Sequence, residues 1–411
     1  MEKAGITLFS QLINLLPRDL LENIASSYYK PGNASKYSCW DQLVALVFSH
    51  LAGCDSLREI EDGLYSALQT INHARGAKAV KRTTLAYANE HRDYRIFEAL
   101  YNALVPRFSK CFDLTFPKKY SKPTYAIDST TITLCMKLFP WASYKSTKGG
   151  IKLHTALDLS TCMPCVMDMT EARVHDSKAT REILAKLPAF SVVVMDRGYN
   201  DYELFADLNE RGTVFVTRLK ENAKTSPYVK IDADPLQRWG SYDVTFISEE
   251  ARKRCGDTVF RVVQWHDDTT DRWFEFLTND RNLSAQEVAD LYKARWQIEL
   301  FFKKIKQNLK VKSFIGTSEN AVMSQIWTAA IVTMLVEVLR MRSTYPWAFS
   351  RLFHFLRLNL FTFKPLNQWI DRPDIPEARC RNAPGWGGIC FQQTLDLFAE
   401  GPVLASSTAV S

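Results

Sequence analysis

The sequence predicts a mixed α/β core with a β-rich insertion, placed between a helical N-terminal region and a helical C-terminal region. Three observations predict this class. Strand-like and helix-like segments alternate between residues 124 and 219, apolar residues recur at three-to-four spacing before residue 116, and short strand patterns fill the stretch from about 221 to 285. We therefore expect three parts in the 411-residue chain, at 1–116, 117–345 and 346–411.

The first 116 residues show helical periodicity and no strand pattern. Apolar residues follow three-to-four spacing in "FSQLINLLPRDLLENIA" and "WDQLVALVFSHLAG". Further on, in "GAKAVKRTTLAYANEHRDYRIFEALYNAL", a basic run with Lys81 and Arg82 precedes an N-cap at Thr83 or Thr84 and a long helix. This pattern suits a DNA-binding domain whose helix N-terminus meets phosphates, and the alternative is a solvated basic turn before a core helix.

The predicted core begins after the Pro- and Lys-rich linker "FPKKYSKP" at 116–123. Three strands come first, and then helices and strands alternate, which favours a mixed sheet. In chain order the predicted elements are the strand "TYAIDSTTITL", the hairpin "KLHTALDLS" and "PCVMDMTEA", the helix "DSKATREILAKL", the strand "FSVVVMDRGYND", the helix "DYELFADLNERG" and the strand "TVFVTRLK".

The β-rich insertion contains three predicted strands, "YDVTFIS", "TVFRVVQW" and "RWFEFLTN". After it, "LSAQEVADLYKARWQIELFFKKIKQNL" opens on a capping box of Ser284 and Glu287 and is predicted to be one long helix. The chain is helical again from 320 to a loose tail. The apolar segment 321–341 includes Gln325 and Glu337, which favours a buried helix over a membrane span.

Two aspartates occupy positions where a strand would be apolar or would end. Asp128 lies within "TYAIDSTTITL", and Asp196 closes "SVVVMD" before the turn at Gly198. A buried carboxylate needs donors, a cation or solvent, so Asp128 needs partners at the sheet. Active sites of open α/β sheets lie at the carboxyl ends of strands. The two aspartates are therefore candidate catalytic residues, although either alone could be a turn cap or an ion-pair partner.

Glu299 is a single carboxylate among one arginine and four lysines in "LYKARWQIELFFKKIKQ". At about 100° per residue, with Tyr292 at zero, Arg295, Glu299 and Lys306 fall at about 300°, 340° and 320°. This polar stripe borders an apolar band that is expected to pack, consisting of Leu291, Ala294, Ile298, Phe301, Phe302, Ile305 and Leu309.

Two carboxylates from strands and one from a helix supply the hard oxygen ligands that Mg²⁺ or Mn²⁺ prefers. Two such ions about 4 Å apart can activate an attacking oxygen and stabilise a leaving oxygen in phosphoryl transfer. Phosphates would then be bound beside the site by Tyr292, Arg295 and Lys306. The alternative is a solvated helix face whose Arg295–Glu299 and Glu299–Lys303 pairs contribute only about a few tenths of a kcal/mol each.

The remaining signals are weaker. Cys162 and Cys165 form a C-x-x-C pair without a second pair at zinc-finger spacing, and His175 near a helix start could orient a site group or simply cap. Trp273 in the insertion could stack on an unpaired base, although a buried core tryptophan is commoner. Nine scattered cysteines indicate a reducing cytoplasm, no signal peptide is expected, and the net charge of +7 fits a polyanionic partner without proving one.

Tyr292, Arg295, Glu299 and Lys306 reproduce a Y-x2-R-x3-E-x6-K signature, and the blocks "AIDSTTITL", "VHDSKA" and "MDRGYND" appear in a matching order. Over roughly 120–345 the chain thereby resembles bacterial insertion-sequence transposases with a DDE, ribonuclease H-like catalytic core. The resemblance implies a β insertion before the glutamate and two Mg²⁺ ions, with Mn²⁺ as a substitute, at a triad of Asp128, Asp196 and Glu299. It further implies that Trp273 stacks on a flipped end base.

The function expected from these features is cut-and-paste DNA transposition by a homodimer that acts on double-stranded DNA, namely the terminal inverted repeats of its element and the target. Two alternatives are a plain metal-dependent nuclease and a non-catalytic DNA-binding protein on the same fold. The expected location is the bacterial cytoplasm, at the nucleoid when the protein is bound to DNA, and no membrane is expected to be a partner.

Overall fold

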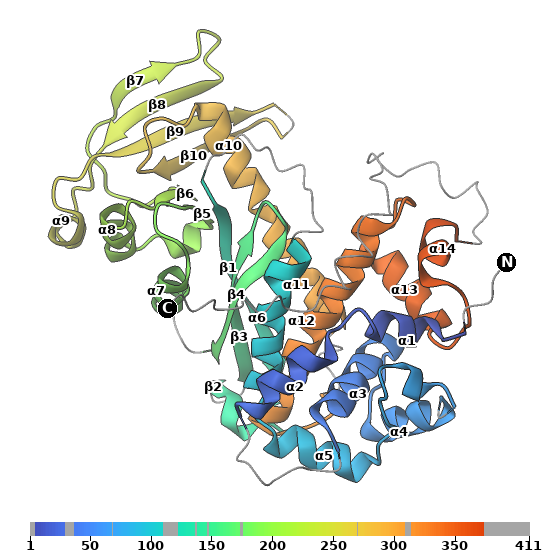
Figure 1. Ribbon diagram of the computed structural model, residues 1–411. Helices are drawn as coiled ribbons and strands as arrows, with labels where there is room; N and C mark the ends of the chain where they lie inside the picture. Colours follow the sequence, from blue (N-terminus) through green and yellow to red (C-terminus); the bar gives the residue numbers. More distant parts are fainter. Residues whose placement is uncertain are drawn as a thin grey trace, which may run out of the picture. The chain divides into compact units, whose positions relative to one another are not determined.

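The computed structural model describes residues 5–28, 37–67, 69–109, 122–135, 138–145, 148–172, 176–268, 270–308 and 314–373 (Figure 1). The chain divides into two compact units, one comprising 1–85, 106–112 and 330–411 and the other comprising 86–105 and 113–329. The expected three-part division stays a prediction. Outside the described residues lie most of the linker, His175, Leu309 and the expected C-terminal tail.

One ten-stranded mixed sheet organises the second unit, in the order β2-β3-β1-β5-β6-β10-β9-β8-β7, with β4 paired to β3 (Figure 1). Among the described strands, β1, β5 and β6 are parallel neighbours, and the other pairings are antiparallel. The predicted mixed α/β class is therefore confirmed. The strands are β1 Thr124–Leu134, β2 Ser143–Lys145, β3 Lys148–Asp158, β4 Met163–Glu171, β5 Val192–Met195, β6 Val214–Arg218, β7 Val229–Ala233, β8 Trp239–Val244, β9 Phe260–Asp267 and β10 Arg272–Thr278.

The predicted β insertion is part of this sheet. Its last strand, β10, pairs antiparallel with β6 through Phe276 and Arg218, so the insertion extends the main sheet to the β7 edge. The structure also contains a strand, β7, and a helix, α9 (Glu249–Cys255), that the sequence patterns did not predict. A signal for α9 was present, because Ser248 caps it, acidic residues fill its first turn and basic residues its last turn.

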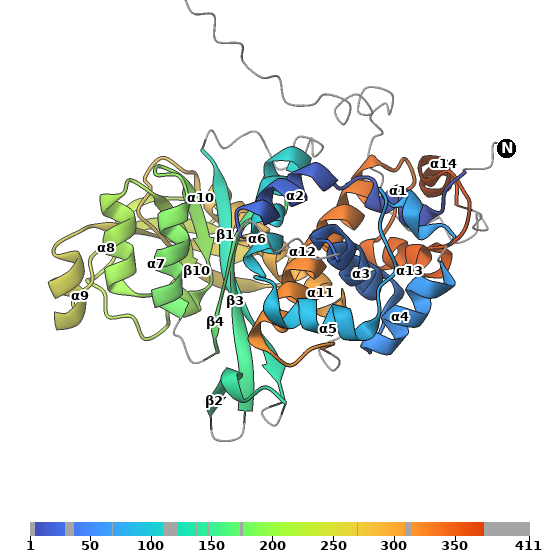
Figure 2. The same cartoon turned by 60° about the horizontal axis from the view of Figure 1, so that its bottom comes forward.

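Helices cover both faces of the sheet. Figure 2 shows α7 and α8 on one side of β1 and β3 and α11 on the other. Strand side chains alternate between these faces, so each strand supplies one layer to each helical cover. The helices and short 3₁₀ turns of this unit's central part are η2 Pro140–Ala142, α7 Asp176–Lys186, η3 Arg197–Tyr199, α8 Tyr202–Glu210, α10 Ala285–Ala294 and α11 Trp296–Asn308.

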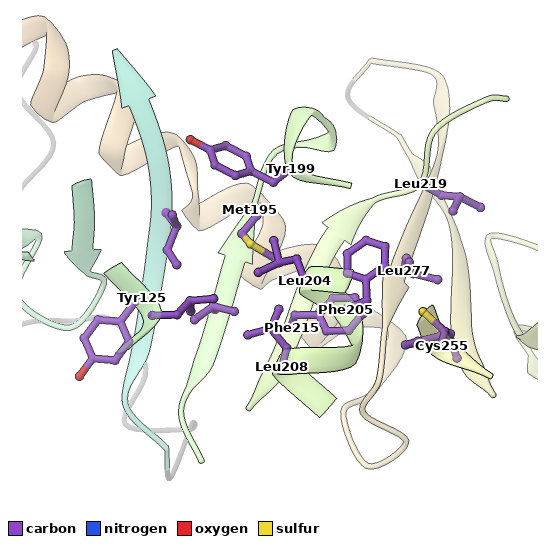
Figure 3. Close-up of a cluster of buried hydrophobic side chains, with 14 of the residues drawn as sticks. Tyr125, Met195, Tyr199, Leu204, Phe205, Leu208, Phe215, Leu219, Cys255 and Leu277 are labelled. Atoms are coloured by element: carbon purple, nitrogen blue, oxygen red, sulfur yellow. The ribbon is translucent and has the colours of Figure 1, made fainter. Parts of the chain in front are cut away.

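The main apolar core lies between the sheet and α7, α8 and α9. Figure 3 shows Phe205 of α8 beside Phe215 of β6, and their rings stack at 4.7 Å between centroids. Ile127 and Met195 enter the same cluster from β1 and β5. Because this cluster takes alternate residues of both strands, it decides which strand residues face the opposite side of the sheet.

The first unit is helical, as predicted for both terminal regions. Its α3 is buried on every side from Cys39 to Leu51, and it ends at Gly53, whose φ of 72° favours glycine. The N–H of Leu8 donates to the Thr362 carbonyl at 3.0 Å, which joins the two terminal regions of the chain within this unit. Its elements are α1 Leu8–Ile13, α2 Arg18–Ser26, α3 Cys39–Ala52, α4 Leu57–Ser66, η1 Ile71–His73, α13 Phe349–Asn359 and α14 Leu366–Asp371.

Three helices have residues in both units: α5 Arg82–His91, α6 Arg95–Ser109 and α12 Glu319–Arg342. Among the described residues, α12 is the one helix long and apolar enough to cross a membrane, and the whole of its apolar window is buried in the protein. Two of its buried polar residues have partners: Gln325 accepts from the N–H of Ile315 at 3.0 Å, and Glu337 pairs with Arg340 at 2.6 Å. The prediction of a buried helix is confirmed.

Phe205→Ala is expected to destabilise the protein by about 3–5 kcal/mol, because it leaves a cavity beside the stacked Phe215 ring. Urea unfolding followed by circular dichroism would measure the loss. Leu236→Ala is the control, because Leu236 is 72% exposed and its truncation should change the free energy of unfolding by less than about 0.5 kcal/mol. Equal effects of the two substitutions would contradict the assigned core.

Candidate active site

The two strand aspartates lie side by side at the end of the parallel pair β1 and β5. Ile127 is in register with Met195, and the next residues are Asp128 and Asp196. Ile127 and Met195 point into the core under α7 and α8, so both aspartates lie on the face covered by α10 and α11. The parallel register therefore brings together two residues that are 68 positions apart in the sequence.

The backbone at Asp196 is held by its neighbours. Its carbonyl accepts from the Thr217 hydroxyl of β6 at 3.2 Å and from the N–H of Tyr199 at 3.0 Å. The Asn200 side chain ties the same turn to β6 by donating to the Arg218 carbonyl at 2.9 Å. These bonds fix where the chain leaves the sheet. The predicted strand "TVFVTRLK" contained Thr217, but its role depends on strand order and no sequence pattern indicated it.

The predicted single helix is two helices, α10 and α11, joined at Arg295. At the junction the N–H of Arg295 bonds to the Tyr292 carbonyl at 3.2 Å, and the N–H of Ile298 bonds to the Arg295 carbonyl at 3.0 Å. These are i to i−3 bonds, which wind the chain more tightly than an α-helix. The prediction of one uninterrupted helix is thus wrong at this residue, because the capping and periodicity signals do not register a one-residue change of hydrogen bonding.

The predicted packed face of α10 and α11 is largely confirmed. Leu291, Ile298, Phe301, Phe302 and Ile305 are buried. Ala294 is only partly buried. The polar stripe borders this face, as expected, and it turns Tyr292 and Arg295 toward Asp196 at the end of β5 and Asp128 in the middle of β1.

Side chains of the polar stripe contact all three carboxylates. Arg295 donates to Asp128 Oδ2 at 3.3 Å and to Glu299 Oε1 at 2.7 Å, and its side chain is only 12% exposed. The Tyr292 hydroxyl donates to Asp196 Oδ1 at 3.2 Å, and the Arg295 guanidinium lies 5.6 Å from the centre of the Tyr292 ring. One buried cation thus sits among three carboxylates drawn from two strands and a helix.

Burial dominates the electrostatics of this cluster. Desolvation raises the pKa of Asp128 from 3.8 to about 6, although the N–H of Ser129 and the charge of Arg295 lower it. Desolvation also raises the pKa of Tyr292, and the charge of Asp196 adds to that rise. Burial by itself lowers the pKa of Arg295, but its hydrogen bond to Glu299 and the nearby acidic groups more than offset this, so the net shift is upward. The guanidinium therefore stays charged beside the carboxylates.

The donor set suits a hard divalent cation, since Asp128, Asp196 and Glu299 are all carboxylates and are linked through Arg295 and Tyr292. The side chains as placed do not enclose one: across the described ranges, no three carboxylate, imidazole or thiol groups are close enough to hold a metal ion. Arg295 lies between two of these carboxylates, because it bonds to one oxygen of Asp128 and one of Glu299. A metal at this position would have to replace the guanidinium.

The other predicted DNA contacts lie outside this cluster. Lys306 is exposed on α11, about 10 Å further along the helix axis than Glu299 at 1.5 Å per residue. Lys81 and Arg82 are exposed at the N-terminal end of α5, and they belong to the first unit. Of the other lysines of α10 and α11, Lys293 is exposed and Lys304 is partly exposed.

Trp273 is 55% exposed on β10 and not buried in the core. The centre of its ring lies 5.1 Å from that of His266, its partner across the β9–β10 pair, and Trp273 lines a cavity of about 490 Å³. The other lining residues are Arg218, Leu219, Glu221, Gln264, Phe274 and Glu275. The ring of Phe276, on the same strand, is 4.9 Å from that of Tyr292, whereas Trp273 alternates with Phe276 along β10 and projects from the face that carries Leu277 and the core.

The cysteine pair has an ordinary structural role. Cys165 Sγ donates to the Ala156 carbonyl at 3.3 Å, and burial raises the pKa of its thiol to about 12. Cys162 has a φ of 52° in the β3–β4 turn. A thiol that resists ionisation is a poor zinc ligand, so these observations favour packing and turn formation over a metal site.

Comparison with known families gives two matches. A family model described as "Transposase DDE domain" matches residues 119–335, a segment that includes all three carboxylates, Arg295 and Trp273. A second model, described as "Domain of unknown function (DUF4372)", matches residues 4–77.

Three curated relatives are transposases by name. "Probable transposase for insertion sequence element IS5377" of Geobacillus stearothermophilus is 32% identical over 53% of this chain and 57% of the relative, so the chain spans little more than half of that protein. "Putative transposase y4zB" of Sinorhizobium fredii is 32% identical over 62% of this chain and 70% of the relative. "Putative transposase for insertion sequence element IS4SA" of Synechocystis is 27% identical over 64% and 72%.

A solved structure of a piggyBac transposase synaptic complex with hairpin DNA aligns with 91% of this chain and 83% of that chain. Its TM-score is 0.40 at 11% identity, which is too low to carry an argument.

Asp128→Asn is expected to stabilise the folded protein near neutral pH. Because burial raises the pKa of Asp128 from 3.8 to about 6, the folded chain holds this proton more tightly than the unfolded chain. The stability linked to the group is therefore complete below about pH 4 and is lost as the pH rises through about 6. Asparagine has no proton to lose, so the variant should gain up to about 3 kcal/mol at about pH 7.5 and nothing near pH 4.

Urea unfolding of both proteins across this pH range measures the difference. Glu210→Gln, at an exposed residue of α8, removes the same charge and should show no such pH-dependent gain. Parallel pH profiles for Asp128→Asn and the unsubstituted protein would refute the desolvation of Asp128.

Proposed function

Because this chain belongs to the family with a transposase DDE domain, we propose that it is the transposase of a bacterial insertion sequence and excises and inserts its element by cleaving and joining DNA strands. The observation that supports this activity best is the grouping of Asp128, Asp196 and Glu299 around Arg295 and Tyr292 within the matched segment. Three carboxylates with a largely buried arginine among them favour a polynucleotidyl transferase over a protein that only binds DNA.

We assign the catalytic and metal-binding roles to Asp128, Asp196 and Glu299. Mg²⁺, with Mn²⁺ as a substitute and two ions per site, would be held by these carboxylates and would supply activation of the attacking oxygen and charge stabilisation at the leaving oxygen. The pairing of β1 with β5 fixes the backbone beside Asp128 and Asp196, whereas Glu299 reaches the site from α11.

Arg295 and Tyr292 would bind phosphates of the element end. Arg295 is already poised among the carboxylates, and a DNA phosphate offers its guanidinium a bidentate partner in exchange for them. Lys306, exposed further along α11, would contact the backbone outside the reacting nucleotide. Lys81 and Arg82, at the start of α5, are further backbone contacts in the proposed DNA-binding domain.

Trp273 would stack on a base flipped out of the element end. Its exposed ring and the neighbouring Phe274 form aromatic walls of the cavity, while Arg218, Gln264 and Glu275 give it polar edges. Stacking on an aromatic side chain is worth about 1–3 kcal/mol per base.

The working form that we propose is a homodimer, with the protein acting in the bacterial cytoplasm at the nucleoid. Double-stranded DNA is its partner, both as terminal inverted repeats and as target, and the net charge of +7 favours such a polyanion. A single active site per chain acting on two element ends is the reason to expect two chains in the synaptic complex.

Purified protein is expected to join a pre-cleaved element end to a supercoiled plasmid in the presence of Mg²⁺. The terminal repeats in the DNA that flanks the gene provide the substrate, and gel analysis of labelled ends detects the joined product. Cleavage without any joined product would indicate a plain nuclease instead. Binding without cleavage or joining would indicate a DNA-binding protein that lacks the chemistry.

Glu299→Gln is expected to keep end binding and to lose strand cleavage. The substitution removes one proposed metal ligand and leaves the basic helix in place. Loss of a residue behind a ligand usually costs about 10- to 100-fold, so loss of the ligand itself should cost more. Gel-shift and nicking assays on the same DNA separate the two properties.

Asp290→Asn is the matched control, because it removes the same charge from an exposed position of α10 and should cleave normally. Normal cleavage by Glu299→Gln would remove Glu299 from the triad.

A further inference from the structure

Thr155 lies on β3 directly opposite Asp128 of β1 in the antiparallel pair. Directly opposed residues project from the same face of a sheet, with Cβ atoms about 4.5–5.5 Å apart. The adjacent pair, Ile127 and Ala156, belongs to the core under α7 and α8. Thr155 therefore shares with Asp128 the face that α11 covers.

The Thr155 hydroxyl is buried without a hydrogen-bond partner. The residue is 0% exposed, and its Oγ1 neither donates nor accepts a bond in this arrangement. A buried unsatisfied hydroxyl costs about 1–3 kcal/mol, and valine has the same shape without that cost. Stability of the fold alone would therefore favour valine at this position. A hydrogen-bond partner that becomes available in another state of the site would explain the hydroxyl.

Asp128 is the group beside it whose bonding has to change during the proposed reaction. At present Oδ1 accepts from the N–H of Ser129 at 2.7 Å and Oδ2 accepts from Arg295 at 3.3 Å. When Arg295 moves to a DNA phosphate, the carboxylate loses a donor and becomes free to turn about its side-chain bond. A hydroxyl about 5 Å away at Cβ is within reach of that carboxylate.

We propose that Thr155 is a positioning residue, which donates its hydroxyl to the Asp128 carboxylate once Arg295 has left and thereby holds the carboxylate in its metal-binding orientation. This inference rests on the proposed function. Groups behind a ligand fix its rotamer and raise its affinity for the ion, and their loss typically costs about 10- to 100-fold in metal affinity.

The test compares Thr155→Val with Thr155→Ser in the full chain, with Mn²⁺ alone as the probe. Free Mn²⁺ is measured by electron paramagnetic resonance, and stability is measured by urea unfolding. The valine variant is expected to bind Mn²⁺ at least about 10-fold more weakly and to be as stable as the unsubstituted protein or more so. The serine variant keeps the hydroxyl and should keep the Mn²⁺ affinity.

Thr213→Val is the matched control, since Thr213 is a buried threonine beside the end of β6 remote from Asp196. It should leave Mn²⁺ affinity unchanged. If Thr155→Val fails to fold, the comparison of Thr155→Ala with Thr155→Ser replaces it. Equal Mn²⁺ affinity with and without the hydroxyl would reduce Thr155 to a packing residue.

Asp128→Asn distinguishes this failure from failure of the proposed function. If Asp128→Asn loses Mn²⁺ and Thr155→Val does not, only the role of Thr155 is wrong. If Asp128→Asn binds Mn²⁺ as well as the unsubstituted protein, the metal site of the proposed function is wrong, and the role of Thr155 falls with it.

Discussion

The in-register parallel pairing of β1 with β5 is the constraint on which the candidate site depends. Ile127 lies beside Met195, and the next residue on each strand is an aspartate. Since side chains alternate, the apolar pair enters the core under α7 and α8 while both carboxylates face α10 and α11. A slip of one residue in either strand would place a carboxylate in the core. The apolar cluster thus fixes the carboxylates although it contains none of them.

Partial burial of the Asp128 carboxylate destabilises the fold, and the raised pKa of Asp128 expresses that cost. Arg295 offsets this cost by bonding to Asp128 and Glu299, and the same acidic groups keep its guanidinium charged by raising its pKa. The change of helical winding at Arg295 lies at the same place, between α10 and α11. The oxygen atoms of Asp128 and Glu299 that bond to Arg295 in this state are therefore the same atoms that a bound cation would need.

The β insertion contributes a residue beside the candidate site because it continues the main sheet. Because β10 pairs with β6, the strand that follows the Asp196 turn, residues of the insertion come close to the carboxylates without crossing the sheet. Phe276 reaches the Tyr292 ring, whereas Trp273 lines a cavity and projects from the other face of β10. A separate β domain on a linker would not hold an aromatic ring at a fixed place beside the site.

The sequence by itself determined the fold class, the two strand aspartates and the polar stripe that includes Glu299, because strand and helix periodicities are local and short-range patterns record them. The capping signal of α9 is local and was overlooked. The sequence did not determine the exposure of Trp273 or the partners of Arg295. Those depend on which strands become neighbours, and strand order is set by contacts between residues far apart in the chain. Thr217 and Thr155 are ordinary strand residues in the sequence, and only the pairing of β5 with β6 and of β1 with β3 places them beside the aspartates.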